Sequence, residues 1–567
     1  MFKRILLLGA LWSMQIGSVQ AAAVAMPDRF SAAAAKEVLL QGGNAVDAAV
    51  AAGFVLAVTY PEAGNLGGGG FMTLFTRPVE NGQTKLQAKQ QAYFLDYRET
   101  APQAAFRDLY LDQQGEVIPY RSLVGYRASG VPGTVMGLWQ AHQRFGSKPW
   151  KNLLQYAIDY AEQGFEVPQA LADNRRWYQQ WIEGKSRDAL NFSDFFGGLQ
   201  AGQLFKQPQL AQTLRRIADK GAADFYQGKT AKALVAQMQA HGGLITLDDL
   251  AAYRAKWREP VRFDWQGSEV LSAPPPSSGG VAIGQLLKLY ALLKPDLQVQ
   301  LKQNRELPEQ ALKTHFYAEL EKRVYADRAE FLGDPDFVEV PVSRLLDDAY
   351  LQQRAQGVLW DAISESETIR PGRIELPETT HFSIVDAHGN AVSNTYTLNM
   401  PFGSGVVIEQ AGFLMNNEMD DFSTKPGVAN VFGVVGGTAN EIAPHKRMLS
   451  SMSPTIVLKD GEVAMVVGTP GGSTIITSVF QVILNVFEAG MTPQQAVDAP
   501  RVHHQLLPKD QIAYNPELPE EVKASLELMG YNLTRNNYMG DVQLIVCAKA
   551  GCDAASDGRG RGVSAGW

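Results

Sequence analysis

The feature that most constrains the fold of this chain is the segment Glu378–Ser383, Glu-Thr-Thr-His-Phe-Ser, after which a mainly helical sequence becomes rich in strand patterns. A threonine hydroxyl is an effective nucleophile only beside a base, and the α-amino group released by cutting the preceding peptide bond is one such base. One interpretation of the segment is therefore that the chain is a precursor that cleaves itself between Glu378 and Thr379. The alternative is that Thr379 and Thr380 simply begin a β-strand, because threonine favours strands.

Composition limits the possible partners. The chain has 567 residues, 45% of them hydrophobic, which is enough for a large core. Its formal net charge of −8 does not provide the basic face that nucleic acid requires, so we expect no nucleic-acid partner. The histidines lack companions at metal-ligand spacing, so we expect no metal and no other cofactor.

The N-terminus has the pattern of a secretory signal peptide. Residues 1–4 include the basic pair Lys3-Arg4, residues 5–16 are mostly apolar, and Val19-Gln20-Ala21 offers small residues for cleavage. An uncleaved anchor is the alternative, although the apolar stretch is short for a membrane span. We expect residues 1–21 to be removed and the protein to be exported without a membrane segment, to the periplasm if the source is a Gram-negative bacterium.

Cys547 and Cys552 are the two cysteines of the chain, and they flank an expected β-turn. Opposed positions of a hairpin can bring two sulfurs together, and an oxidising compartment would permit a bond between them. A disulfide and a pair of free thiols both remain open.

Apolar periodicity predicts a helical first part. The Ala-rich residues 31–41 form one expected helix, and residues 45–59 form a second that Asn44 can cap. The second is apolar on nearly every side, so we expect it to be buried. A strand is expected at 71–75, and the pattern from about 132 to 330 is mainly helical.

A hairpin is expected directly after Thr379. If His388-Gly389 is its two-residue loop, Thr380 faces Thr397 in the paired strand. A longer loop would shift this register by a residue or two. In either case Thr397 and Asn399 lie near Thr379.

A second hairpin, 455–458 with 463–467, leads to Gly471 and Gly472, which precede an apolar helix at 475–487. Unpaired N–H groups at the start of a helix are suited to bind an oxyanion. The alternative is that the two glycines only let strand and helix pack tightly.

Seven segments together resemble the γ-glutamyltransferases, a family also called γ-glutamyltranspeptidases or glutathione hydrolases. They follow the family's order between about residue 35 and the C-terminus. The segments are Pro61–Phe71, Asp96–Pro102, Glu378–Ser383, Thr395–Asn399, Asn416–Ser423, Leu449–Thr455 and Pro470–Ser473.

This resemblance implies the N-terminal nucleophile hydrolase fold, an α/β (α+β) fold built as a four-layer αββα sandwich. Two associated subunits would form it after self-cleavage, a large one from residues 22–378 and a small one from 379–567. The resemblance also implies cleavage of the γ-glutamyl amide bond of glutathione through an acyl-enzyme on Thr379. The acyl group would then pass to water or to an amino acid or peptide acceptor.

The resemblance assigns roles to individual residues. Thr397 would orient the hydroxyl of Thr379, and Gly471 and Gly472 would donate N–H bonds to the oxyanion. The substrate carboxylate would bind Arg98 and two serines, and the ammonium would bind three polar residues. These five are Ser450 and Ser451 for the carboxylate, and Asn399, Glu418 and Asp421 for the ammonium.

Simpler roles compete with these assignments. Arg98 could form a surface ion pair with Glu99, Asp421 could cap a helix, and the two serines could form a turn. The segment 426–437 resembles the family's lid loop, with Phe432 where several bacterial members have tyrosine.

Two other functions also compete. One is an acylase for glutaryl amides, whose substrate lacks the α-ammonium. The other is an exported solute-binding protein, which would remain one uncut polypeptide.

Overall fold

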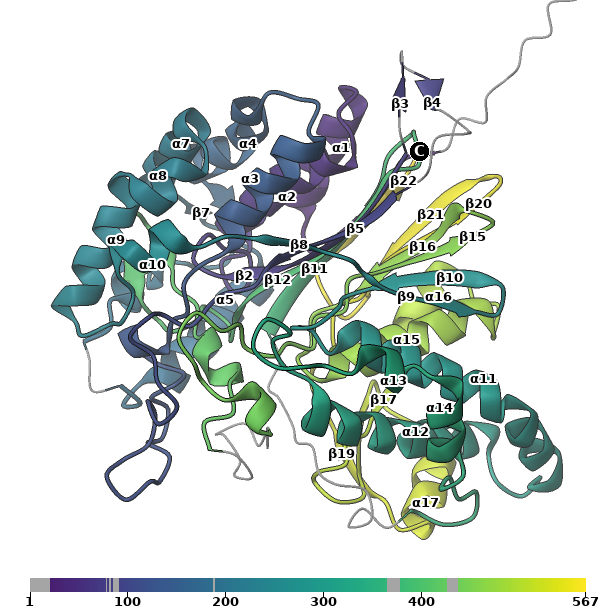
Figure 1. Cartoon of the computed structure of the whole chain (residues 1–567). Coiled ribbons are helices and arrows are strands. Elements are labelled where there is room, and N and C mark those ends of the chain that lie inside the picture. The colour runs from purple at the N-terminus through teal and green to yellow at the C-terminus, as the bar shows by residue number, and fades with distance from the viewer. Residues whose placement is uncertain are drawn as a thin grey trace, which may run out of the picture.

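Two large β-sheets face each other in the computed structural model, and helices cover both outer faces (Figure 1). This arrangement is the αββα sandwich that the sequence predicted. The structure describes residues 21–77, 79–80, 83–84, 91–186, 189–364, 378–425 and 437–567. Residues 1–20 of the expected signal peptide and residues 426–436 of the expected lid, with Phe432, lie outside these ranges.

The larger sheet has seven antiparallel strands drawn from both ends of the chain. Strand β11, which carries Thr379, lies in its interior between β1 and β12. In sheet order the strands are β22 (Val563–Gly566), β1 (Ala23–Met26), β11 (Glu378–Val385), β12 (Ala391–Asn399), β2 (Gly69–Thr76), β5 (Gln91–Tyr97) and β8 (Lys256–Arg258).

The β11–β12 hairpin is shifted by one residue from the register predicted with a two-residue loop. Thr380 pairs with Tyr396, not with Thr397. The reason is a longer loop, in which the Asp386 carboxylate accepts the N–H of Asn390 at 3.0 Å and the Asp386 N–H donates to the Asn390 carbonyl at 3.0 Å.

A β-bulge lies opposite Thr379. Glu378 pairs with Asn399 and Thr380 pairs with Tyr396, so two residues of β12 face Thr379 alone. A bulge bends its strand and re-aims the side chains beside it. Thr397 therefore lies beside Thr379, although the predicted register was wrong.

The second sheet has six strands, and its predicted hairpin is confirmed as β15–β16. A disulfide joins Cys547 and Cys552 across the β20–β21 hairpin, which decides between the two states that the sequence left open. In sheet order the strands are β21 (Gly551–Ser556), β20 (Gln543–Ala548), β16 (Glu462–Gly468), β15 (Thr455–Lys459), β10 (Ser268–Ser272) and β9 (Val261–Trp265).

Within the described ranges, ten helices lie on the outer side of the seven-stranded sheet (Figure 1). They are α1 (Arg29–Leu40), α2 (Ala45–Thr59), α3 (Thr134–Phe145), α4 (Trp150–Gln163), α5 (Gln169–Ile182), α6 (Phe192–Phe196), α7 (Pro208–Lys220), α8 (Ala222–Gln227), α9 (Lys229–Ala240) and α10 (Leu247–Ala252).

The other helices gather around the six-stranded sheet, and α11 runs longer than the sequence indicated, through Pro295. They are α11 (Gly279–Gln303), α12 (Glu309–Phe331), α13 (Val342–Leu345), α14 (Asp348–Ala355), α15 (Thr474–Phe487), α16 (Pro493–Asp498) and α17 (Glu520–Leu528).

Short elements complete the described chain. The strands are β3 (Val79–Glu80), β4 (Gln83–Thr84), β6 (Phe165–Glu166), β7 (Leu204–Phe205), β13 (Val407–Ile408), β14 (Phe413–Leu414), β17 (Arg501–His503), β18 (Gln511–Asn515) and β19 (Asn532–Arg535). The 3₁₀ turns are η1 (Tyr126–Ala128), η3 (Glu418–Asp421) and η4 (Thr438–Asn440).

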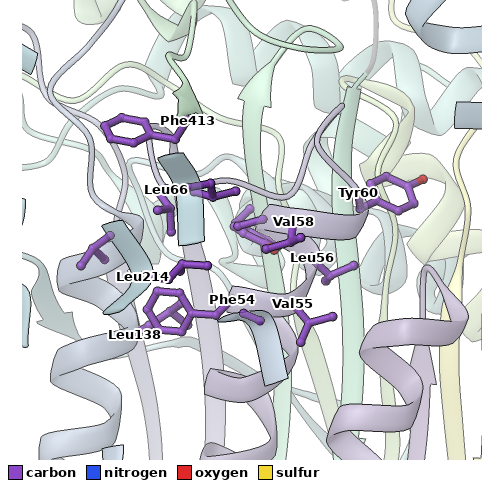
Figure 2. Close-up of a cluster of buried hydrophobic side chains, with 14 of the residues drawn as sticks. Phe54, Val55, Leu56, Val58, Tyr60, Leu66, Leu138, Leu214 and Phe413 are labelled. Atoms are coloured by element: carbon purple, nitrogen blue, oxygen red, sulfur yellow. The ribbon is translucent and has the colours of Figure 1, made fainter. Parts of the chain in front are cut away.

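Helix α2 is the centre of the first helical layer, and all of its residues are buried, as predicted. Asn44 caps it in a reciprocal capping box with Asp47. Figure 2 shows Phe54 of α2 close to Leu138 of α3 and Leu214 of α7. Within the described ranges, no helix is both long and apolar enough to cross a bilayer.

Candidate active site

A small cavity gathers most of the residues that the sequence predicted for the site. Its volume is about 30 Å³, which is enough room for an ordered water molecule. Gly471 adjoins the cavity in sequence without lining it. The lining residues are Arg98, Thr379, Thr397, Asn399, Glu418, Asp421, Ser450, Ser451, Met452, Gly472 and Ile475.

Thr379 and Thr397 face each other across the bulge. The Thr379 hydroxyl donates to the Thr397 hydroxyl oxygen over 3.5 Å, which is long for such a bond. The Thr397 oxygen also accepts the N–H of Asn399 at 2.8 Å, and Asn65 donates to the Thr397 carbonyl at 2.8 Å. Thr397 is thus fixed through both its hydroxyl and its carbonyl oxygen.

Arg98 is fully buried, so the alternative that it forms an ion pair at the protein surface is wrong. Its guanidinium donates to the carboxylates of Glu418 and Asp421. Glu99 lies 3.7 Å from the same guanidinium, measured between Nη1 and Oε2. One guanidinium therefore gathers three acidic side chains inside the protein.

Gly471 and Gly472 lie in the segment between β16 and α15, just before the helix, as predicted. Their φ angles are 140° and 54°, in the region that favours glycine. Within the described ranges, no acceptor for either N–H group is found. A Cβ at Gly471 would lie 2.6 Å from the Thr474 hydroxyl oxygen, so glycine also serves close packing here.

Comparison with known proteins identifies the family, because the model of the γ-glutamyltranspeptidases matches residues 31–567. The chain belongs to the γ-glutamyltranspeptidase family. A glutathione hydrolase proenzyme from Pseudomonas aeruginosa is 56% identical over 95% of this chain and 94% of its own length.

Solved structures agree with this membership. A γ-glutamyltranspeptidase from Pseudomonas nitroreducens, complexed with L-DON, is 51% identical, with a TM-score of 0.55 over 63% of this chain and 99% of its own. A cephalosporin acylase from Bacillus halodurans has a TM-score of 0.80 and covers 99% of both chains. Because it is only 24% identical, it supports the fold alone.

Burial and ion pairing together set the charges of this γ-glutamyltranspeptidase site. Burial disfavours the charged form of Arg98, but the attraction of Glu418, Asp421 and Glu99 outweighs it and raises the pKa of Arg98. Burial also raises the pKa of Glu418, against the opposing effect of Arg98. Burial likewise raises the pKa of Glu99 to about 8.

Three asparagines that the sequence analysis did not assign hold the acidic side of the site. Asn416 donates to the carbonyls of Gly67 and Gly130 at 2.7 and 2.9 Å, and accepts the N–H of Glu418 at 3.0 Å. Asn417 stands at the N-cap of η3, so Asp421 is not the helix cap that was its alternative.

Asn440 is the third asparagine, and it ties Asp421 to the opposite wall. Its amide donates to the Asp421 carbonyl at 2.7 Å and accepts the N–H of Leu449 at 2.9 Å. The family segments include Asn416 and Asn417, which is a usable signal, but no segment includes Asn440.

The simpler role predicted for Ser450 and Ser451, a turn, is confirmed for Ser450 alone. The Ser450 hydroxyl oxygen accepts the N–H of Met452 at 3.1 Å, which is a serine turn. The Ser451 hydroxyl oxygen instead accepts from Arg328, a residue that the sequence analysis did not single out. Both serines still line the cavity.

His381 lies on β11, two residues after Thr379, and its ring lies against Gly468 of the second sheet. Its ring nitrogens contact the hydroxyls of Thr395 at 2.7 Å and Ser383 at 3.1 Å. Burial lowers the pKa of His381 to about 3, so the ring is neutral near pH 7. Within the described ranges, no group of three or more His, Cys, Asp or Glu residues is arranged to hold a metal.

The burial of Glu99 predicts a pH-dependent stability. The folded chain keeps this proton up to about pH 8, whereas the unfolded chain releases it near the ordinary value of 4.5. The contribution of Glu99 to stability is therefore complete below pH 4.5 and is lost as pH rises towards 8. Urea unfolding of an uncut Thr379→Ala chain should show that, between pH 5 and 8, the free energy of unfolding falls less in Glu99→Gln than in its parent, by about 3.5 kcal/mol.

The control for this measurement is Glu520→Gln, because the Glu520 side chain is 88% exposed. This variant should follow the pH profile of its parent. Parallel profiles for Glu99→Gln and its parent would contradict the assignment of a buried proton to Glu99.

Proposed function

We propose that this chain is a self-cleaving γ-glutamyltransferase that releases the γ-glutamyl group of glutathione and passes it to water or to the amine of an amino acid or peptide. Membership of the γ-glutamyltranspeptidase family supports this function. The observation that carries it is the cavity in which Thr379 meets a buried arginine and two carboxylates. The nucleophile and a pair of opposite charges are what an acyl transfer from a zwitterion needs.

Self-cleavage comes first in the proposed sequence of steps. The Thr379 hydroxyl attacks the carbonyl of Glu378, the C–N bond breaks, and the hydroxyl proton passes to the leaving nitrogen. The result is an ester between Glu378 and the Thr379 oxygen, with a free α-amine on Thr379. Water then hydrolyses the ester, which leaves a carboxylate on Glu378 and restores the hydroxyl.

Two subunits result from this cut, a large one from residues 22–378 and a small one from 379–567. Strand β1 of the large part lies between β11 and β22 of the small part, and β10 pairs with β15. Both sheets therefore contain strands from both parts. Shared backbone ladders would keep the heterodimer together after cleavage.

Acyl transfer follows on the new N-terminus. The Thr379 hydroxyl attacks the γ-carbonyl of the substrate while its own α-amine accepts the proton. The N–H groups of Gly471 and Gly472 stabilise the oxyanion, and the leaving amine departs with a proton. Water or an acceptor amine then attacks the γ-glutamyl ester and regenerates the enzyme.

Substrate recognition is an exchange of ionic partners. In the uncut chain the Arg98 guanidinium binds Glu418 and Asp421. A γ-glutamyl group brings one carboxylate and one ammonium, so Arg98 can turn to the former while the acidic pair turns to the latter. Ser450 and Ser451 add donors for the carboxylate, and Asn399 adds an acceptor for the ammonium.

Export through a cleaved signal peptide, residues 1–21, remains part of the proposal. The Cys547–Cys552 disulfide supports it, because such bonds persist in oxidising compartments. The destination is the periplasm if the source is a Gram-negative bacterium.

The competing acylase function is tested by comparing a γ-glutamyl anilide with a glutaryl anilide. The glutaryl group lacks the ammonium and leaves buried carboxylates without a partner, so kcat/KM should be lower by about 10⁴. Rates of anilide release measure both values. Equal or faster release from the glutaryl anilide would replace γ-glutamyl transfer with acylase activity.

Replacement of the nucleophile should abolish both reactions. Thr379→Ala should give one uncut chain on a denaturing gel and no turnover of the γ-glutamyl anilide, because the variant has no attacking oxygen.

The matched control for this test is Thr380→Val, since the buried Thr380 hydroxyl has no hydrogen-bond partner among the described residues. This variant should yield two subunits and near-normal turnover. Two fragments from Thr379→Ala would refute the nucleophile assignment.

The conformation of the oxyanion loop also makes a prediction. Alanine at Gly471 would meet both a φ of 140° and a contact at 2.6 Å, so the loop must move its N–H groups. We expect kcat to fall about 100-fold, with KM changed less than about threefold.

Gly490→Ala is its matched control, because Gly490 has a φ of 64° and nothing within 4 Å of a new Cβ. It carries a similar backbone strain away from the site and should keep kcat. A Gly471→Ala enzyme that keeps its kcat would remove these amides from the mechanism.

A further inference from the structure

We propose that Arg328, on helix α12, is a positioning residue that sets the two serines for the substrate carboxylate. The inference rests on the proposed function and extends it to a residue outside the cavity lining. Arg328 would belong to the large subunit, whereas both serines would belong to the small subunit.

Arg328 bridges two segments with separate arms of its guanidinium. Its Nη2 donates to the Ser451 hydroxyl oxygen at 2.9 Å, and its Nε donates to the Ser278 hydroxyl oxygen at 3.0 Å. The residue is buried behind the wall that Ser450 and Ser451 form. A planar guanidinium fixes both directions at once, which a lysine ammonium does not.

The direction of the first bond determines what Ser451 can do. A guanidinium has donors and no acceptor, so the Ser451 oxygen must accept. The hydroxyl proton of Ser451 therefore points away from Arg328. Because Ser451 lines the cavity, this orientation suits donation to a carboxylate bound there.

The second bond reaches Ser450 through Ser278. The Ser278 hydroxyl accepts from Arg328 and donates to the Ser450 carbonyl at 2.8 Å. The Ser278 N–H donates to the same carbonyl at 2.8 Å. One side chain thus orients the hydroxyl of Ser451 and fixes the main chain of Ser450.

One turn before Arg328, Tyr325 on the same face of α12 contacts the oxyanion side of the site. The Tyr325 hydroxyl donates to the carbonyl of Ser473, which follows Gly472. Helix α12 therefore braces the oxyanion loop through Tyr325 and the carboxylate side through Arg328. Loss of Arg328 should impair recognition of the carboxylate, and a general loosening of α12 should impair turnover of every substrate.

A substrate pair separates these two effects. The γ-glutamyl anilide carries the α-carboxylate, and the 4-aminobutanoyl anilide lacks it but keeps the amine. The selectivity is the ratio of the two kcat/KM values on self-cleaved enzyme. Arg328→Gln should lower this selectivity about tenfold, mainly through a higher KM for the γ-glutamyl anilide.

Arg328→Lys keeps the charge but loses the fork, so its selectivity should fall about threefold. The matched control is Arg354→Gln on α14. Arg354 also donates to α12, to Asp327 at 3.0 Å and to the carbonyl of Arg323, without reaching the serines. Its removal should leave the selectivity unchanged.

Several outcomes would overturn the proposal. One is an equal loss of both activities in Arg328→Gln, which would leave Arg328 a purely structural residue. Another is full selectivity in Arg328→Lys, which would exclude the two-armed geometry. Failure of both variants to self-cleave also counts against it, because orienting a substrate serine is not needed for that step.

The proposed function fails separately. If the native enzyme does not prefer the γ-glutamyl anilide over the 4-aminobutanoyl anilide, carboxylate recognition is itself wrong. A native preference that persists in the variants rejects only the role of Arg328.

Discussion

The rest of the structure depends on the pairing of β11 inside the seven-stranded sheet. Its neighbours are β1, near the N-terminus, and β12, which continues the same hairpin. The proposed cleavage point therefore lies in a ladder that cannot form until distant parts of the chain have met. This makes self-cleavage a consequence of folding, since the unfolded chain does not bring Thr379 beside Thr397. Interleaved strands also explain how two subunits could remain one enzyme.

Charge is the second constraint on the site. Burying Arg98 alone would be costly, and so would burying the carboxylates alone, because ions lose their hydration. The cluster meets this cost with internal pairs, Arg98 with Glu418 and Asp421, at the wall of a small cavity. A zwitterionic substrate can replace those pairs without changing the net charge of the site. A singly charged substrate cannot, which gives a physical basis for specificity.

Much of the architecture was predictable because it follows local patterns. Helix α2 has a cap and an unbroken apolar run, and β15 and β16 alternate around a short turn. Local patterns did not reveal the β11–β12 register, because the five-residue loop is closed by the Asp386 side chain. Nor did they reveal Arg328 and Asn440, whose partners lie on segments that meet only in the folded chain.

The sequence by itself determined the family, the αββα class and the identity of most residues around the cavity, because these depend on residue types in a fixed order. Tertiary structure alone decided which of those residues form ion pairs with one another. It buried Arg98 against three acidic groups, placed a bulge opposite Thr379 and joined Cys547 to Cys552. Such outcomes depend on distances and dielectric environment between remote segments, which a linear pattern does not contain.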